Sequence, residues 1–137
     1  MLRIAKRGAT LVCEDMTLRP SGAAPNSEAH CTIKQIIYQV AARAGTDWDI
    51  GLRLYGLFAS GIQNIEVGIF PSAYASGEEK RLPEYTLLEL APRLLAAGAI
   101  SEVDLRRLAA SARAYTERAD TLVILPPMIQ VWGTKPD

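Results

Sequence analysis

The chain has 137 residues, and its 15 Lys and Arg side chains balance its 15 Asp and Glu side chains at pH 7. This length suits one domain with one core, and zero net charge gives no electrostatic reason to expect nucleic acid or an anionic membrane as a partner. No uncharged apolar stretch reaches the ~20 residues of a membrane span, no signal peptide is visible, and two cysteines are too few for a disulfide framework. We therefore expect a single cytoplasmic domain covering residues 1–137.

The first half of the chain predicts a strand, a loop and two helices. Residues 9–13 read as a short buried strand, and residues 17–26 contain two prolines and a glycine, which indicates a loop. Asn26 or Ser27 can cap a helix that runs to Ala44, and Gly45 is its natural stop. One apolar stripe follows that helix, formed by Ile33, Ile36, Ile37, Val40, Ala41 and Ala44. Asp49 can cap a second, shorter helix over 50–60.

The second half predicts a strand over 65–70, a polar and mobile loop over 71–81, and two helices. Pro83 suits the first turn of the earlier helix, and Pro92 inside it should kink or split it. The later helix begins with a capping box, Ser101 with Asp104. Arginines on this helix alternate with acidic residues, which indicates a solvated face rather than a basic binding patch.

Residues 128–134 form the stretch around which the other elements are expected to pack. They are nearly all apolar, are rich in β-branched and aromatic residues, and are enclosed by prolines on both sides. That pattern is typical of a strand buried on both faces. We therefore expect this last strand at the centre of the sheet.

Few residues suggest chemistry. Glu14 and Asp15 follow a strand beside a loop, where α/β sheets often bind ligands, although solvated turn carboxylates are an equally good interpretation. Tyr74, in the predicted loop, and Met128 could line a small apolar site. His30 and Cys31 point about 100° apart on a helix and chelate one ion poorly, so we expect a surface histidine and no metal site.

Three stretches resemble the C-terminal half of the class I S-adenosylmethionine-dependent methyltransferases. Residues 2–15 resemble the lead-in to the fifth strand of that family, although Arg7 stands where Pro is usual and Ala9 where the second Gly is usual. Residues 52–67 resemble the helix, corner and sixth strand, with Ser60-Gly61-Ile62 as a variant of the corner. Residues 130–136 resemble the seventh strand.

The resemblance implies an α/β fold with a three-stranded sheet and flanking helices. The strands would take the order fifth, seventh, sixth of a methyltransferase-like Rossmann fold, with the last strand central and antiparallel. Any other strand order would indicate an unrelated fold. The family binds its cofactor through a Gly-x-Gly-x-Gly turn in its first half, and no Gly-x-Gly occurs in this sequence. We therefore expect no cofactor on this chain alone, and S-adenosylmethionine only if a partner or a missing N-terminal half supplies the site.

Two functions follow as expectations. The first is a stand-alone, methyltransferase-like domain without catalysis of its own, either a remnant or a small-molecule-binding domain in which Glu14, Asp15, Tyr74 and Met128 would contact a small apolar molecule. It would form a homodimer through the exposed edge of strand 9–13. The alternative is the substrate-side part of a split or truncated methyltransferase that acts on a small molecule. Whether the chain is part of an enzyme is left open by the sequence.

Overall fold

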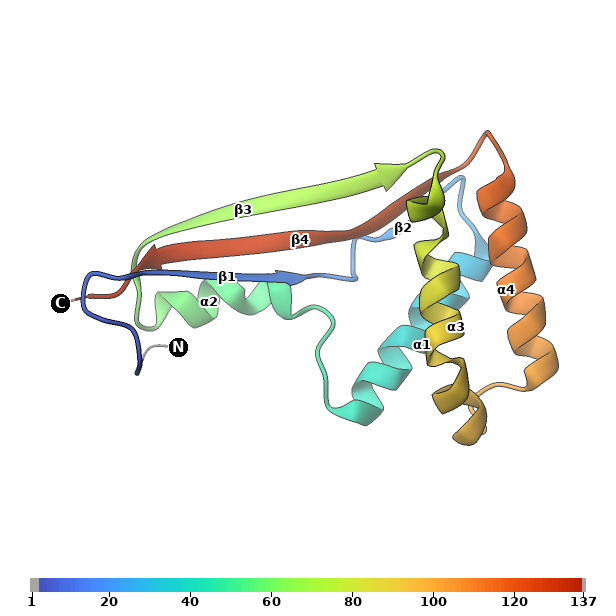
Figure 1. Ribbon diagram of the computed structural model, residues 1–137, viewed down its shortest axis with the longest axis horizontal. Coiled ribbons are helices and arrows are strands. Elements are labelled where there is room, and N and C mark those ends of the chain that lie inside the picture. Colours follow the sequence, from blue (N-terminus) through green and yellow to red (C-terminus); the bar gives the residue numbers. More distant parts are fainter. Residues whose placement is uncertain (1–2, 137) are drawn as a thin grey trace. The chain divides into compact units, whose positions relative to one another are not determined.

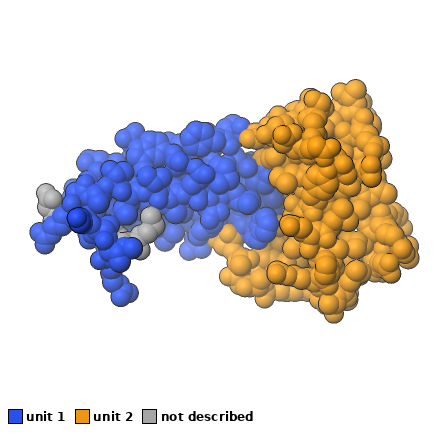
Figure 2. Space-filling model, viewed as in Figure 1, with its two compact units in different colours: residues 1–20, 48–71, 126–137 blue, residues 21–47, 72–125 orange. Residues whose placement is uncertain are grey.

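The computed structural model describes residues 3–136, and the chain forms two compact units (Figure 2). Leu2, with which the first resembling stretch begins, lies outside the described residues. Unit 1 comprises residues 1–20, 48–71 and 126–137, and unit 2 comprises residues 21–47 and 72–125. No described helix is both long enough and apolar enough to cross a bilayer.

The sheet has four antiparallel strands, and the last strand pairs with the other three (Figure 1). The strands are β1 (Thr10–Met16), β2 (Gly22–Ala24), β3 (Gln63–Tyr74) and β4 (Leu122–Thr134). The expected α/β class is therefore present, but the expected three-stranded sheet is wrong. The additional strand, β2, lies in the predicted loop and pairs with Leu122–Ile124.

Strand β4 begins six residues earlier than expected and includes Pro126 and Pro127, which were expected to precede it. Its residues 122–124 pair with β2 and its residues 128–134 pair with β1, so Pro126 and Pro127 lie between the two ladders. A proline that cannot donate a backbone hydrogen bond is tolerated there. The Pro127 carbonyl still accepts a hydrogen bond from the Thr17 amide, at 3.1 Å.

Only one face of β4 is fully buried in unit 1, which corrects the expectation of burial on both faces. Ile129 and Val131 are buried on that face, and they contact Leu54, Phe58 and Ile62 in the core of the unit. Trp132 and Gln130, on the other face, are half-buried. Strand β1 is likewise less buried than expected, because Thr10, Val12 and Glu14 are exposed.

The core face of unit 1 is covered by a 3-10 turn, η1 (Ile50–Arg53), and the short helix α2 (Leu54–Ala59), which together replace the single helix expected over 50–60. The chain then turns sharply into β3. Asn64 has a left-handed backbone with φ of 52°, and a Cβ atom on Gly133 would lie 2.5 Å from Ile62 Cγ2. The glycine on β4 therefore lets the corner before β3 approach the sheet closely.

Strand β3 extends beyond its expected end at residue 70 and includes Tyr74, so the first part of the predicted mobile loop is a strand. The rest of that loop contains a 3-10 turn, η2 (Glu78–Arg81).

Unit 2 is built on three packed helices, α1 (Glu28–Ala44), α3 (Leu82–Ala96) and α4 (Glu102–Glu117). The ends of α1 are as predicted, because the Ser27 side chain accepts from the His30 amide and Gly45 adopts a left-handed conformation. The capping box of α4 is also confirmed by the hydrogen bond from the Asp104 amide to Ser101 Oγ. Pro92 lies inside α3 without splitting it.

Candidate functional site

Three of the four predicted site residues lie at one end of the β1–β4 ladder in unit 1. Glu14 pairs with Gln130, whose Nε2 donates to Glu14 Oε2 at 3.0 Å, and Met128 pairs with Met16. Asp15 Oδ1 accepts from the Met16 amide at 2.8 Å. Tyr74 belongs to unit 2 and is half-buried.

The two carboxylates do not form an acid–base pair. Successive side chains of a strand point to opposite faces, so Glu14 and Met128 share the face that carries Trp132, whereas Asp15 points to the α2 side. Glu14 is exposed and Asp15 is half-buried. General acid–base catalysis by two carboxylates requires both groups to reach one substrate bond, and this arrangement separates them.

Asp49 organises the chain that leaves β1. Its Oδ1 accepts from Thr17 Oγ1 at 2.7 Å and from the Arg19 amide at 2.9 Å, and its Oδ2 lies 3.7 Å from Arg19 Nε. Asp49 was expected to cap a helix, but no side-chain capping bond to η1 is present. The sequence offers no signal for this role, because Thr17 and Asp49 are 32 residues apart.

Gly51 is the second residue that sequence reasoning missed at this end of the sheet. A Cβ atom there would lie 2.7 Å from the Met16 carbonyl oxygen and 2.8 Å from that of Asp15. Glycine therefore allows η1 to touch the backbone at the carboxyl end of β1. Together, Asp49 and Gly51 position the residues that follow Glu14 and Asp15.

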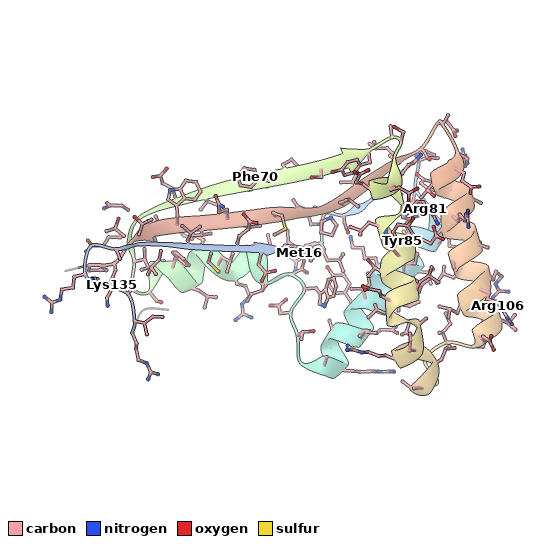
Figure 3. All side chains as sticks on the ribbon, in the orientation of Figure 1. Met16, Phe70, Arg81, Tyr85, Arg106 and Lys135 are labelled. Atoms are coloured by element: carbon pink, nitrogen blue, oxygen red, sulfur yellow. The ribbon has the colours of Figure 1, made fainter. Side chains whose placement is uncertain are left out.

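We use the name open face for the side of the unit 1 sheet that carries Val12, Gly68, Phe70 and Trp132. Val12 is 49% exposed and Phe70 is 53% exposed. The rings of Phe70 and Trp132 both lie over Gly68. A Cβ atom added to Gly68 would be 3.0 Å from Phe70 Cε2 and 3.4 Å from Trp132 Cζ3. Figure 3 shows Phe70 on β3 and Met16 at the end of β1. The open face thus combines aromatic and aliphatic side chains with the hydrogen-bonded pair of Glu14 and Gln130.

Unit 2 contains a groove of about 440 Å³ between α1 and α4. Its lining is mixed, with two carboxylates, one guanidinium and two hydroxyl groups beside two apolar residues. These residues are Glu28, Ala29, Thr32, Asp104, Arg107, Leu108 and Ser111. None of the four predicted site residues lines this groove, and its polar lining does not fit the small apolar ligand that we expected.

His30 is buried, which corrects the expectation of a surface histidine. Its Nδ1 hydrogen bonds with Ser27 Oγ at 2.9 Å, its ring centroid lies 4.8 Å from that of Tyr115, and its Nε2 has no partner among the described residues. Burial lowers the pKa of His30. The spacing of His30, Ile33 and Ile37 could have revealed this, because the apolar stripe of α1 extends back to residue 30.

Ser27 and His30 do not form a nucleophile–base pair. Ser27 Oγ is the N-cap of α1, which accepts the His30 amide, and both side chains are at least nine-tenths buried. Catalytic pairs of this kind present the hydroxyl to a cleft. Cys31 is exposed and its thiol donates to Asn26 Oδ1, whereas Cys13 belongs to unit 1. No three or more His, Cys, Asp or Glu side chains in residues 3–136 gather where they could hold a metal ion.

A charged cluster at the start of α3 has a structural role. Arg81 donates from Nε and Nη2 to the two carboxylate oxygens of Glu84 at 3.0 and 3.2 Å, and it lies 4.7 Å from the ring centroid of Tyr85 (Figure 3). Tyr85 in turn donates a hydrogen bond to Glu78. That bond raises the pKa of Tyr85, and the bond to Glu84 raises the pKa of Arg81. These groups satisfy one another, so the cluster joins η2 to α3.

No protein-family model matches the chain. No curated protein matches it either.

Proposed function

We propose that this chain is the substrate-side portion of a methyltransferase-like protein, and that it has no catalytic activity until another polypeptide supplies the S-adenosylmethionine site. The observation that carries the proposal is the pairing within unit 1. An antiparallel last strand, β4, lies between β1 and β3, and β1 pairs with no other strand among the described residues. A sheet of this kind can be extended by a cofactor-binding sheet at β1.

Methyl transfer is compatible with the sparse chemistry at the end of β1. The reaction depends mainly on aligning two substrates and excluding water, and only some methyl acceptors need a base. Glu14 and Met128 are proposed to contact a small substrate there, because they share the open face at the carboxyl end of β1. Asp15 would orient the backbone through its bond to the Met16 amide. Tyr74 lies in unit 2 and is not part of this proposal.

The backbone of β1 has an outward side suited to strand addition. The Thr17 amide donates to the Pro127 carbonyl, and the Lys135 amide donates to the Ala9 carbonyl. In an antiparallel ladder every second residue directs its backbone amide and carbonyl at the partner strand. Because Ala9 and Thr17 do so here, the odd-numbered residues of β1 form the backbone hydrogen bonds to β4. The amides and carbonyls of Thr10, Val12 and Glu14 are therefore directed away from β4. An added strand would meet them and would cover Val12.

A second copy of the chain is the other candidate occupant of this edge, as the stand-alone dimer requires. The exposed Val12 and the zero net charge favour it, because no long-range repulsion separates two copies. In that case the protein would be a dimeric module that binds a small molecule without catalysis. The two functions are distinguished by which molecule pairs with the β1 edge, a second copy of the chain or a cofactor-binding polypeptide.

The test compares Val12→Pro with Val12→Ala. Proline removes the outward amide of residue 12 without removing a bond to β4, and alanine removes the same side chain but keeps the amide. A candidate partner encoded by a neighbouring gene is co-purified with each variant, and each complex is titrated calorimetrically with S-adenosylmethionine. We expect wild type and Val12→Ala to form the complex with the partner and to bind S-adenosylmethionine in that complex. Val12→Pro should bind the partner at least tenfold more weakly.

Two outcomes overturn the proposal. Binding of S-adenosylmethionine to the isolated chain would show that a cofactor half is not needed. A partner complex that Val12→Pro leaves unchanged would show that the β1 edge is not the junction. If the isolated wild type is a dimer in light scattering and only Val12→Pro makes it a monomer, the stand-alone function replaces the split enzyme.

A further inference from the structure

We propose that the free edge of β3 is a self-association surface, on which a second copy of this chain pairs antiparallel across a two-fold axis at Gly68. This goes beyond the proposed function, which concerns β1. Among the described residues β3 pairs only with β4, so its other side is an edge. The edge is twelve residues long and is exposed over most of its length.

The side chains near the middle of β3 are apolar and exposed. Val67 is 47% exposed, Ile69 is 63% exposed and Phe70 is 53% exposed. Val67 and Ile69 point to the core side of the sheet, the side on which Ile65 packs, and Phe70 points to the open face. Apolar groups therefore flank this edge on both faces.

The middle of strand β3 carries few of the features that usually protect an edge. Natural edges are guarded by charged residues, prolines or bulges. Glu66 is the one charged residue on β3, and Pro71 comes only after the apolar segment. Strand β1, by contrast, carries two carboxylates, Glu14 and Asp15, just before its last residue, Met16. The less protected edge of unit 1 is therefore β3, and it suits a second copy better than β1 does.

The sequence of β3 is complementary to itself about Gly68. Antiparallel pairing there places Val67 opposite Ile69 of the second copy, and Ile69 opposite its Val67, which gives two β-branched cross-strand pairs. The two Glu66 residues are then offset by four positions, about 14 Å at roughly 3.4 Å per residue. This exceeds the Debye length of about 8 Å at physiological ionic strength, so their repulsion is screened.

The charge of the chain and the symmetry of this pairing also favour a copy as occupant. A net charge of zero leaves no long-range repulsion between two chains. The two-fold arrangement uses the same edge on both copies and so closes as a dimer. A partner with a different sequence would have to supply its own apolar residues opposite Val67 and Ile69.

Light scattering with three variants tests the surface. Wild type should have twice the 14.9 kDa mass of the chain, and Ile69→Lys should have the mass of one chain, because two ammonium groups would enter the apolar pairs. Val103→Lys is the matched control, since Val103 is 65% exposed on α4, and it should keep the dimer. Val12→Pro should also keep the dimer, which separates this inference from the proposal about β1.

A cross-linking experiment tests the register and does not depend on the folding of Ile69→Lys. In a Cys13→Ala, Cys31→Ser background, Val67→Cys with Ile69→Cys should give a disulfide-linked dimer on oxidation. Val67→Cys alone should cross-link at least tenfold less, because residue 67 faces residue 69 of the copy. A monomeric wild type, a dimer that persists in a folded Ile69→Lys, or equal cross-linking by the single and double variants would overturn the inference.

Discussion

Replacement of Gly51 by alanine should destabilise unit 1 because the added methyl group has no space. All three atoms nearest to its position belong to the backbone, namely the carbonyl oxygens of Asp15 and Met16 and the Met16 carbonyl carbon, at 2.7 to 3.0 Å. Real Cβ atoms do not approach other atoms so closely, and a backbone cannot move aside as a flexible side chain can. Either η1 must withdraw from the end of β1 or β1 must shift.

The expected cost is about 1–3 kcal/mol, the usual range for overpacking a filled interior. Gly56 provides a matched control in the same segment. It lies in α2, is exposed, and has no atom within 4 Å of an added Cβ. At an exposed helical position alanine stabilises the helix relative to glycine by about 0.5–1 kcal/mol. The same substitution should therefore have opposite signs at two positions that are five residues apart.

Urea unfolding followed by tryptophan fluorescence measures both effects. The two tryptophans of the chain, Trp48 and Trp132, both belong to unit 1, so the signal reports on that unit. The free energy of unfolding is expected to fall by about 1.5–2 kcal/mol per molar urea. Gly51→Ala should therefore lower the urea midpoint by about 0.5–2 M, and Gly56→Ala should raise it by about 0.3–0.6 M. A Gly51→Ala variant as stable as wild type would refute the described contact between η1 and β1.

Unit 2 offers two further predictions. Because burial lowers the pKa of His30 below its ordinary value of 6.5, the unfolded chain binds a proton more readily than the folded one. The contribution of neutral His30 should be complete above pH 6.5 and should be lost as the pH falls below it. His30→Phe should reduce the slope of unfolding free energy against pH between 7.5 and 5, measured by circular dichroism, and an unchanged slope would count against a buried imidazole. Tyr115→Phe removes the hydrogen bond to the Pro25 carbonyl at 2.5 Å and should cost about 1–2 kcal/mol in the same assay. The control Tyr55→Phe, at a side chain that is 55% exposed, should stay within about 0.5 kcal/mol of wild type, and equal effects at both positions would refute the Tyr115 bond.

Local signals sufficed to predict the helices of unit 2. The ends of α1 follow from a serine N-cap and a glycine in a left-handed conformation, and the start of α4 follows from its capping box. These features depend on residues within one or two turns of each other, so they are visible in the order of residues. Of the candidate site residues, Glu14, Asp15 and Met128 lie at one end of the β1–β4 ladder, with Glu14 and Met128 on one face of the sheet and Asp15 on the other.

The features that were missed depend on contacts between distant segments. Strand β2 has three small residues without alternation, and it exists only because Leu122–Ile124 pairs with it. The importance of Asp49 and Gly51 arises from their contacts with the chain around the end of β1, more than 30 positions earlier. No local pattern encodes such contacts.

The order of residues alone predicted where α1 begins and ends, where α4 begins, and that the last apolar stretch is a strand, because these features depend on neighbouring side chains. Only the tertiary structure decided that β4 is buried on one face, that His30 lies inside, and that β1 and β3 pair only with β4 among the described residues. The physical reason is that an apolar strand or stripe can be recognised from its residues, whereas what covers it is decided by elements from elsewhere in the chain.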